Sequence, residues 1–94
     1  AAGTNQGTAT LLSKQVNVIT TGVAGSGVRL PSATVGMQLI IINNAGAAIN
    51  VYPATSAQID SLATNLPFTL GIGSRLMIVA TGLAQWYTMV GVYG

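Results

Sequence analysis

The stretch QLIIINNAGAAINVYP, residues 38–53, places apolar runs on both sides of the turn residues Asn-Asn-Ala-Gly. It therefore predicts a β-hairpin, which ends at Pro53 because proline cannot donate a hydrogen bond to a sheet. The first run, Leu39–Ile42, does not alternate with polar residues, although a strand with one solvated face should alternate. We therefore expect the second face of this strand to be covered by a second sheet or by a neighbouring subunit.

Further segments with strand chemistry lie on both sides of this stretch. They are short, rich in β-branched residues and separated by turn signals, and no longer segment has the 3.6-residue period of a helix. The pattern predicts an all-β fold, a compact β-sandwich or small barrel of short antiparallel strands. The segments are residues 15–21, where Val16 and Val18 share a face, 28–31, the surroundings of Ile59, 68–70, and a second hairpin over 73–90 that turns near Thr81-Gly82.

The length of 94 residues corresponds to one domain. We expect residues 15–94 to form a single β domain and residues 1–14 to form an extended N-terminal arm. Gly3, Asn5 and Gly7 interrupt any helix there, and the segment offers little apolar surface to bury. A frayed terminus is the alternative. The segment also lacks the basic start and apolar stretch of a signal peptide.

Charged residues are unusually rare. Lys14, Arg29, Arg75 and Asp60 are the only ones, whereas an average domain has about a quarter charged residues. Either uncharged polar groups keep the protein soluble, or partners cover its surface, and we favour partners. Three scattered basic residues do not form a nucleic-acid surface. The apolar runs are also far shorter than the roughly 18 residues of a membrane-spanning helix.

Catalytic side chains are missing from the composition. The chain has no His, Cys or Glu, so neither a carboxylate pair nor a His-activated nucleophile is available. A conventional zinc site lacks its ligands. The glycine-rich stretch at residues 22–28 lacks the lysine of a phosphate-binding loop. We expect a protein that is not an enzyme and has no metal site and no cofactor.

The charged residues have alternative roles. Asp60 follows Ile59 in a polar turn, where it either bonds its own backbone or pairs with Arg29 or Arg75. Arg29 alternates with apolar neighbours, so it is either a solvated strand residue or a donor to a partner or a neighbouring subunit. Arg75 fits a solvated strand start, and Lys14 marks the junction of arm and body.

The aromatic residues divide between core and surface. Trp86 and Tyr87 are adjacent, so they face opposite sides of a strand. We expect Trp86 in the core and Tyr87 facing outward or a partner. Tyr52 closes the first hairpin, and Tyr93 either anchors the last strand or crosses to a neighbouring subunit.

Four motifs stand out along the chain: GVRLP (27–31), NNAGAAINVYPATS (43–56), IDSL (59–62) and LGIGSRLMIVATGLAQWYT (70–88). Together they resemble a small β domain of tailed-bacteriophage virion proteins. In that group a G-V-R-L-P strand is followed by a hairpin ending in N-V-Y-P-A, an I-N/D-x-L turn and a final G-x-S…W-Y hairpin. The resemblance spans residues 27–88 and is strongest to capsid decoration (cement) proteins.

The resemblance implies a virion structural protein without catalysis. Such proteins commonly sit as homotrimers on the outer capsid and bridge capsomers, so the implied partner is the major capsid protein and the implied location is the capsid surface, after synthesis in the host cytoplasm. A receptor- or glycan-binding domain of a head or tail fibre, using Tyr52, Trp86 and Tyr87, is the alternative. A minor capsid or tail-tube subunit is a third hypothesis. Our candidate capsid or intersubunit contacts are Thr4, Asn5, Gln6, Leu11, Leu12, Lys14, Arg29, Asp60, Tyr87 and Tyr93.

Overall fold

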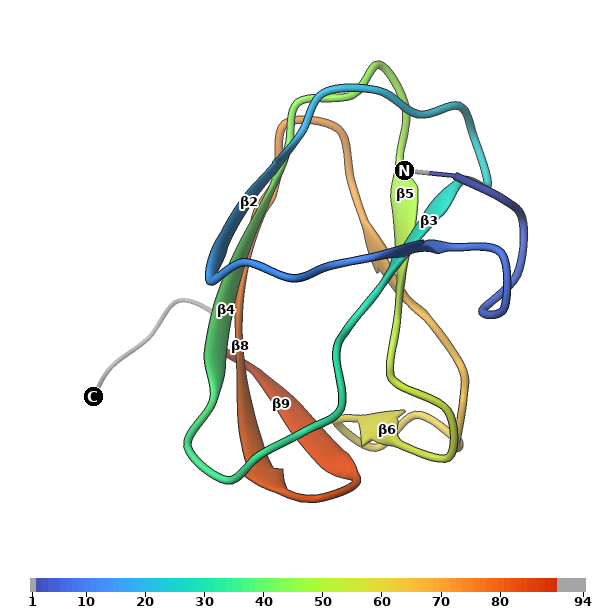
Figure 1. Ribbon diagram of the computed structural model, residues 1–94. Coiled ribbons are helices and arrows are strands. Elements are labelled where there is room, and N and C mark those ends of the chain that lie inside the picture. The colour runs from blue at the N-terminus through green and yellow to red at the C-terminus, as the bar shows by residue number, and fades with distance from the viewer. Residues whose placement is uncertain (1, 90–94) are drawn as a thin grey trace.

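The computed structural model describes residues 2–89, whose strands form two sheets without any helix (Figure 1). The prediction of an all-β fold is confirmed. The four-stranded sheet has the order β1-β3-β5-β7, and the five-stranded sheet has the order β2-β4-β8-β9-β6. The strands are β1 (Thr10–Leu11), β2 (Val16–Ile19), β3 (Gly27–Arg29), β4 (Gln38–Asn43), β5 (Ile49–Tyr52), β6 (Gln58–Ile59), β7 (Phe68–Leu70), β8 (Arg75–Gly82) and β9 (Gln85–Met89).

The chain changes sheet at every connection from β1 to β8. Except for β8 and β9, strands that pair are therefore separated in sequence by at least one strand of the other sheet, and β1–β3, β3–β5, β2–β4 and β6–β9 pair in parallel. Parallel neighbours need such a crossover, which a strand of the second sheet here provides in place of a helix. The pairs β4–β8, β5–β7 and β8–β9 are antiparallel. Both sheets are mixed, so the expectation of antiparallel strands throughout is wrong.

The first predicted hairpin is also wrong, because β4 and β5 belong to different sheets. Between them the chain turns a corner at Asn43, whose side chain is fully buried. Asn43 Nδ2 donates to the carbonyl oxygens of Ala47, Leu70 and Gly71 at 3.0–3.1 Å. Its Oδ1 accepts a hydrogen bond from the backbone N–H of Ala45 at 3.0 Å. These turn residues therefore join two sheets rather than two neighbouring strands.

The second predicted hairpin is confirmed as the antiparallel pair β8–β9. The register shifts between Ala80 and Gly82, which is the signature of a β-bulge beside the tight turn. This pair is the one place in the described chain where consecutive strands remain in the same sheet.

One apolar cluster takes side chains from both sheets. Leu39 and Ile41 point into it from β4, whereas Ile40 and Ile42 point outward and are half-buried. Trp86 is fully buried as expected, and its Nε1 has no hydrogen-bond partner among the described residues. Trp86 is therefore held by apolar packing.

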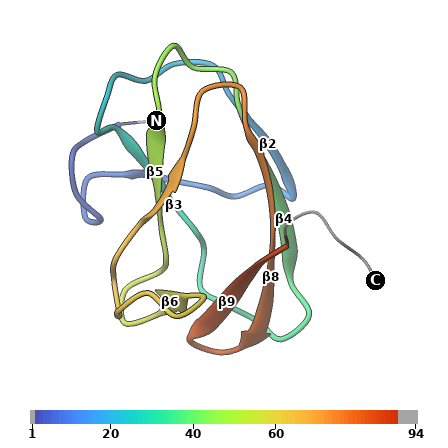
Figure 2. The same ribbon diagram turned by 180° about the vertical axis from the view of Figure 1, so that it is seen from behind.

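The N-terminal residues pack against the four-stranded sheet. Ala2 forms an antiparallel bridge with Gly27, and β1 pairs with β3. Ala9 and Leu12 are buried, and Leu12 belongs to the core cluster. Apolar packing therefore anchors this segment to its own domain. Figures 1 and 2 both show it beside β3 and β5, away from β8 and β9.

Candidate interaction surface

The outer side of the five-stranded sheet carries mostly apolar side chains. Side chains alternate along each strand, and directly paired residues share a face, so the register defines this surface. We call it the open face. Its residues are Val16 and Val18 on β2, Gln38, Ile40 and Ile42 on β4, Arg75, Met77 and Val79 on β8, Gln85, Tyr87 and Met89 on β9, and Gln58 on β6.

A continuous apolar row crosses four strands of the open face. Val16 pairs with Ile40, Ile40 with Met77, and Met77 with Met89. Val16 is 53% exposed, and Met77 and Met89 are 36% and 37% exposed. No described segment therefore covers this row.

The sequence of β2 explains why valines point outward. Ile19 and Asn17 are the buried residues of this strand, while Val16 and Val18 remain about half exposed. Asn17 tolerates burial because its Nδ2 donates to the carbonyl oxygen of Lys14 at 2.8 Å. The two valines share a face as predicted, and that face is the outer one.

Arg75 is the only charged side chain on the open face, next to Ile42 in the sheet register. Asp60 is the only acidic side chain in the sequence. Both of its carboxylate oxygens accept hydrogen bonds from Thr88, at 2.8 Å from the backbone N–H and 2.6 Å from Oγ1. Asp60 also has the positive φ of a turn residue, 51°. Within residues 2–89 it forms no ion pair with Arg29 or Arg75.

The outer side of the four-stranded sheet is different, and we call it the covered face. Its residues are Leu11, Gly27, Arg29, Asn50, Tyr52 and Thr69, and residues 2–9 pack over part of it.

Hydrogen bonds hold this segment on the covered face. Tyr52 donates its hydroxyl to the carbonyl oxygen of Thr4 at 3.4 Å, and Arg29 Nη1 donates to the carbonyl oxygen of Gln6 at 3.5 Å. Gln6 Nε2 donates to the carbonyl oxygen of Pro53 at 2.9 Å. Thr4, Gln6 and Arg29, three predicted contact residues, therefore bind within their own chain.

The remaining candidate residues are dispersed. Asn5 accepts hydrogen bonds from Thr8 within a tight turn. Leu11 is exposed beside a hollow that Arg29 also lines, and Leu12 lies in the core. Tyr93 lies outside the described residues. Of the ten candidates, the structure places only Tyr87 on the open face, where it is 46% exposed.

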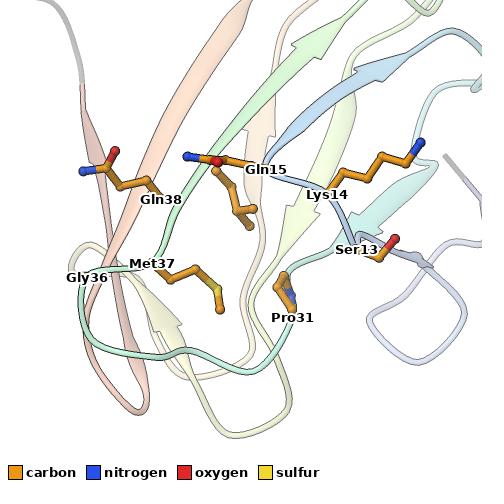
Figure 3. A pocket seen from close by; sticks show the side chains of 8 residues that line it. Ser13, Lys14, Gln15, Pro31, Gly36, Met37 and Gln38 are labelled. Atoms are coloured by element: carbon orange, nitrogen blue, oxygen red, sulfur yellow. The ribbon is translucent and has the colours of Figure 1, made fainter.

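A second feature is a hollow of about 460 Å³ between the β1–β2 connection and the start of β4 (Figure 3). Its apolar lining includes Pro31, Met37 and Leu39, while Gln15 and Gln38 supply amides. Figure 3 shows the Lys14 side chain pointing away from Met37 at its edge. No carboxylate or imidazole lines it, so it offers no acid–base chemistry.

The described residues contain no cluster of metal-ligating side chains. They also contain no helix able to span a membrane. Most residues of the open face were not predicted from the sequence, and the signal for it was the Leu39–Ile42 run, which does not alternate with polar residues. Comparisons with protein-family models, curated proteins and solved structures found no match. The open face is therefore the feature on which a functional proposal rests.

Proposed function

We propose that the protein is a capsid decoration (cement) protein of a tailed bacteriophage. It is a non-enzymatic virion structural protein that binds the major capsid protein on the outer surface of the head and stabilises the shell by bridging capsomers. It acts as a homotrimer on the capsid after synthesis in the host cytoplasm. We also propose that its two sheets and their shared core form a compact sandwich. The four motifs between residues 27 and 88 support this proposal.

The single observation that carries the proposal is the open apolar face. Contiguous exposed apolar surface on a folded domain is typical of an interaction site. Val16, Val18, Met77, Tyr87 and Met89 are each at least about one third exposed on that face. A permanent structural contact has this apolar character, because its centre resembles a domain core cut in half.

The scarcity of charge supports the same function. Burying an ion costs several kcal/mol unless it is well paired, and a surface with three basic and one acidic side chain incurs little of this cost. A weak contact made by one copy also gains strength when many copies occupy one shell.

The glycan-binding alternative has less support. It uses Tyr52, Trp86 and Tyr87 as exposed aromatic contacts, but Trp86 is fully buried and Tyr52 is 7% exposed. Of these three side chains, only Tyr87 presents its ring to solvent.

Capsid binding tests the proposal. Purified protein added to undecorated heads of the phage that encodes it should co-sediment with them and raise the temperature at which they disrupt. Absence of binding would contradict the proposal, and binding to host cells or glycans without capsid binding would support the fibre alternative.

A further inference from the structure

We propose that the open face is the side of the molecule that contacts the capsid, and that it meets an apolar surface carrying a carboxylate opposite Arg75. This inference rests on the proposed function and adds the orientation of the protein and the chemistry of its partner. It replaces the N-terminal segment with the open face as the principal contact.

The size of the open face argues against a stable dimer of this chain through that face. Four strands about 4.8 Å apart, each contributing about five residues at about 3.3 Å, give a projected area of about 300 Å². Side chains make the accessible area larger than the projected area. Even if the area is doubled for this reason, it remains below the roughly 800 Å² per partner of a standard stable interface. The face is suited to a contact that is weak for one copy and is repeated many times on a lattice.

The charge on the open face indicates the partner's chemistry. Arg75 is exposed beside Ile42, and the chain offers it no carboxylate within the described residues, because Asp60 is engaged with Thr88. A second copy placed face to face brings another Arg75 and no free acidic side chain. An arginine at the border of an apolar contact favours a partner carboxylate, which it can bind in bidentate geometry.

The covered face is less suited to this contact. Its Tyr52 is already buried, and residues 2–9 occupy part of it through hydrogen bonds that involve Arg29 and Gln6. A capsid that bound there would first have to displace the chain's own N-terminal segment.

Two variants of the open face test the inference on undecorated heads. Val16→Thr with Val18→Thr keeps the β-branched shape and removes apolar surface, and Arg75→Glu reverses the charge. Each should weaken co-sedimentation roughly tenfold, because apolar area and an interfacial charge pair are lost. Wild-type binding should also weaken as salt is raised.

Matched controls lie outside the open face. Val23→Thr removes an exposed apolar side chain, 73% exposed, from the connection between β2 and β3, and Ala24→Glu adds a negative charge at an exposed position of the same connection. Both should bind like wild type. Thermal unfolding of every variant confirms that it folds.

The outcomes separate the two proposals. If wild type binds and the open-face variants bind equally well, the orientation is overturned while the decoration function stands. If wild type does not bind, the function is overturned and the inference with it. If sedimentation shows a self-associated form that the open-face variants abolish, the occupant is a second copy, and the capsid-facing assignment is overturned.

Discussion

The two outer faces of this molecule belong to different sheets and are built differently. On the covered face, Asn50 and Thr69 are polar, and the hydroxyl of Tyr52 reaches the N-terminal segment. On the open face, Ile40 and Met77 occupy the corresponding middle of the sheet, and no described segment lies over them.

The difference shows that the chain is able to cover a sheet with its own residues. It does so where side chains offer hydrogen-bond donors to a passing backbone, as Arg29 and Tyr52 do for Gln6 and Thr4. Aliphatic side chains offer no such donors, so a polar segment rich in Gly and Thr gains little by packing on the open face. An apolar partner surface gains more free energy on the open face, because both surfaces then bury apolar area.

The largest effect on stability is expected at Asn43, where the chain passes from the five-stranded sheet to the four-stranded sheet. Asn43→Ala should lower the free energy of unfolding by about 3 kcal/mol, because it leaves buried carbonyl groups and the Ala45 N–H without their partner. Urea unfolding measures the loss.

Two further variants isolate the cause at this corner. Asn43→Asp keeps the side-chain shape but replaces the donors by a carboxylate, so it should be at least as destabilising. The exposed neighbour provides the control, since Asn44→Ala should change stability by less than about 0.5 kcal/mol. Equal stability of Asn43→Ala and wild type would contradict the proposed role of the corner.

A smaller loss of stability is expected at Gly27 on the covered face, where the backbone lies close to the Tyr52 ring. A Cβ on Gly27 would lie 2.7 Å from Cε2 of Tyr52 and 3.1 Å from the carbonyl oxygen of Asn50. Gly27→Ala should therefore destabilise the fold by about 2 kcal/mol, in the range of other overpacked sites. Gly46→Ala is the control, because a Cβ there meets nothing within 4 Å. An unchanged free energy of unfolding in Gly27→Ala would mean that the Tyr52 ring and the Asn50 backbone shift to accommodate the added methyl group at little cost.

The strand segments of the fold were predictable from the sequence, but their pairing was not. Alternation and turn signals located β2, β3 and β7 and the β8–β9 hairpin, because these features depend on neighbouring residues. The Asn-Asn-Ala-Gly turn at the end of β4 looked the same as a hairpin turn, since its distinguishing contacts come from Leu70 and Gly71, far along the chain. Local chemistry does not determine whether a turn leads to the same sheet or to the opposite one.

The candidate surface was predicted in part. The unalternating run showed that Ile40 and Ile42 need a second apolar environment, but it did not identify the partner strands. The valines of β2 joined the open face because Asn17 is buried against backbone carbonyl groups, which the residue type alone does not indicate. The polar N-terminal residues were assigned to an outside partner because their hydrogen bonds to Pro53 and Tyr52 depend on the tertiary fold.

A moderate effect is expected when the covering segment is loosened. Gln6→Ala removes the hydrogen bonds from Gln6 Nε2 to Pro53 and Asn65, and it should cost about 1 kcal/mol. The backbone N–H of Gly27, which donates to Ala2 at 3.1 Å, should then exchange faster with solvent. The exposed Gln15→Ala should leave that exchange unchanged. Unaltered Gly27 exchange in Gln6→Ala would show that the segment is held mainly by other contacts.

The smallest effect on stability is expected on the open face itself. Val16→Thr with Val18→Thr should change the free energy of unfolding by only about 0.5 kcal/mol, because both side chains are already half exposed and threonine keeps the β-branched shape. Binding of a hydrophobic dye should nevertheless fall, since the apolar row loses one end. A loss above about 2 kcal/mol would show that these valines are packed by the chain itself. A small loss of stability together with weaker dye binding would mean that these two valines contribute little to folding, as expected of side chains that are apolar for contact with a partner.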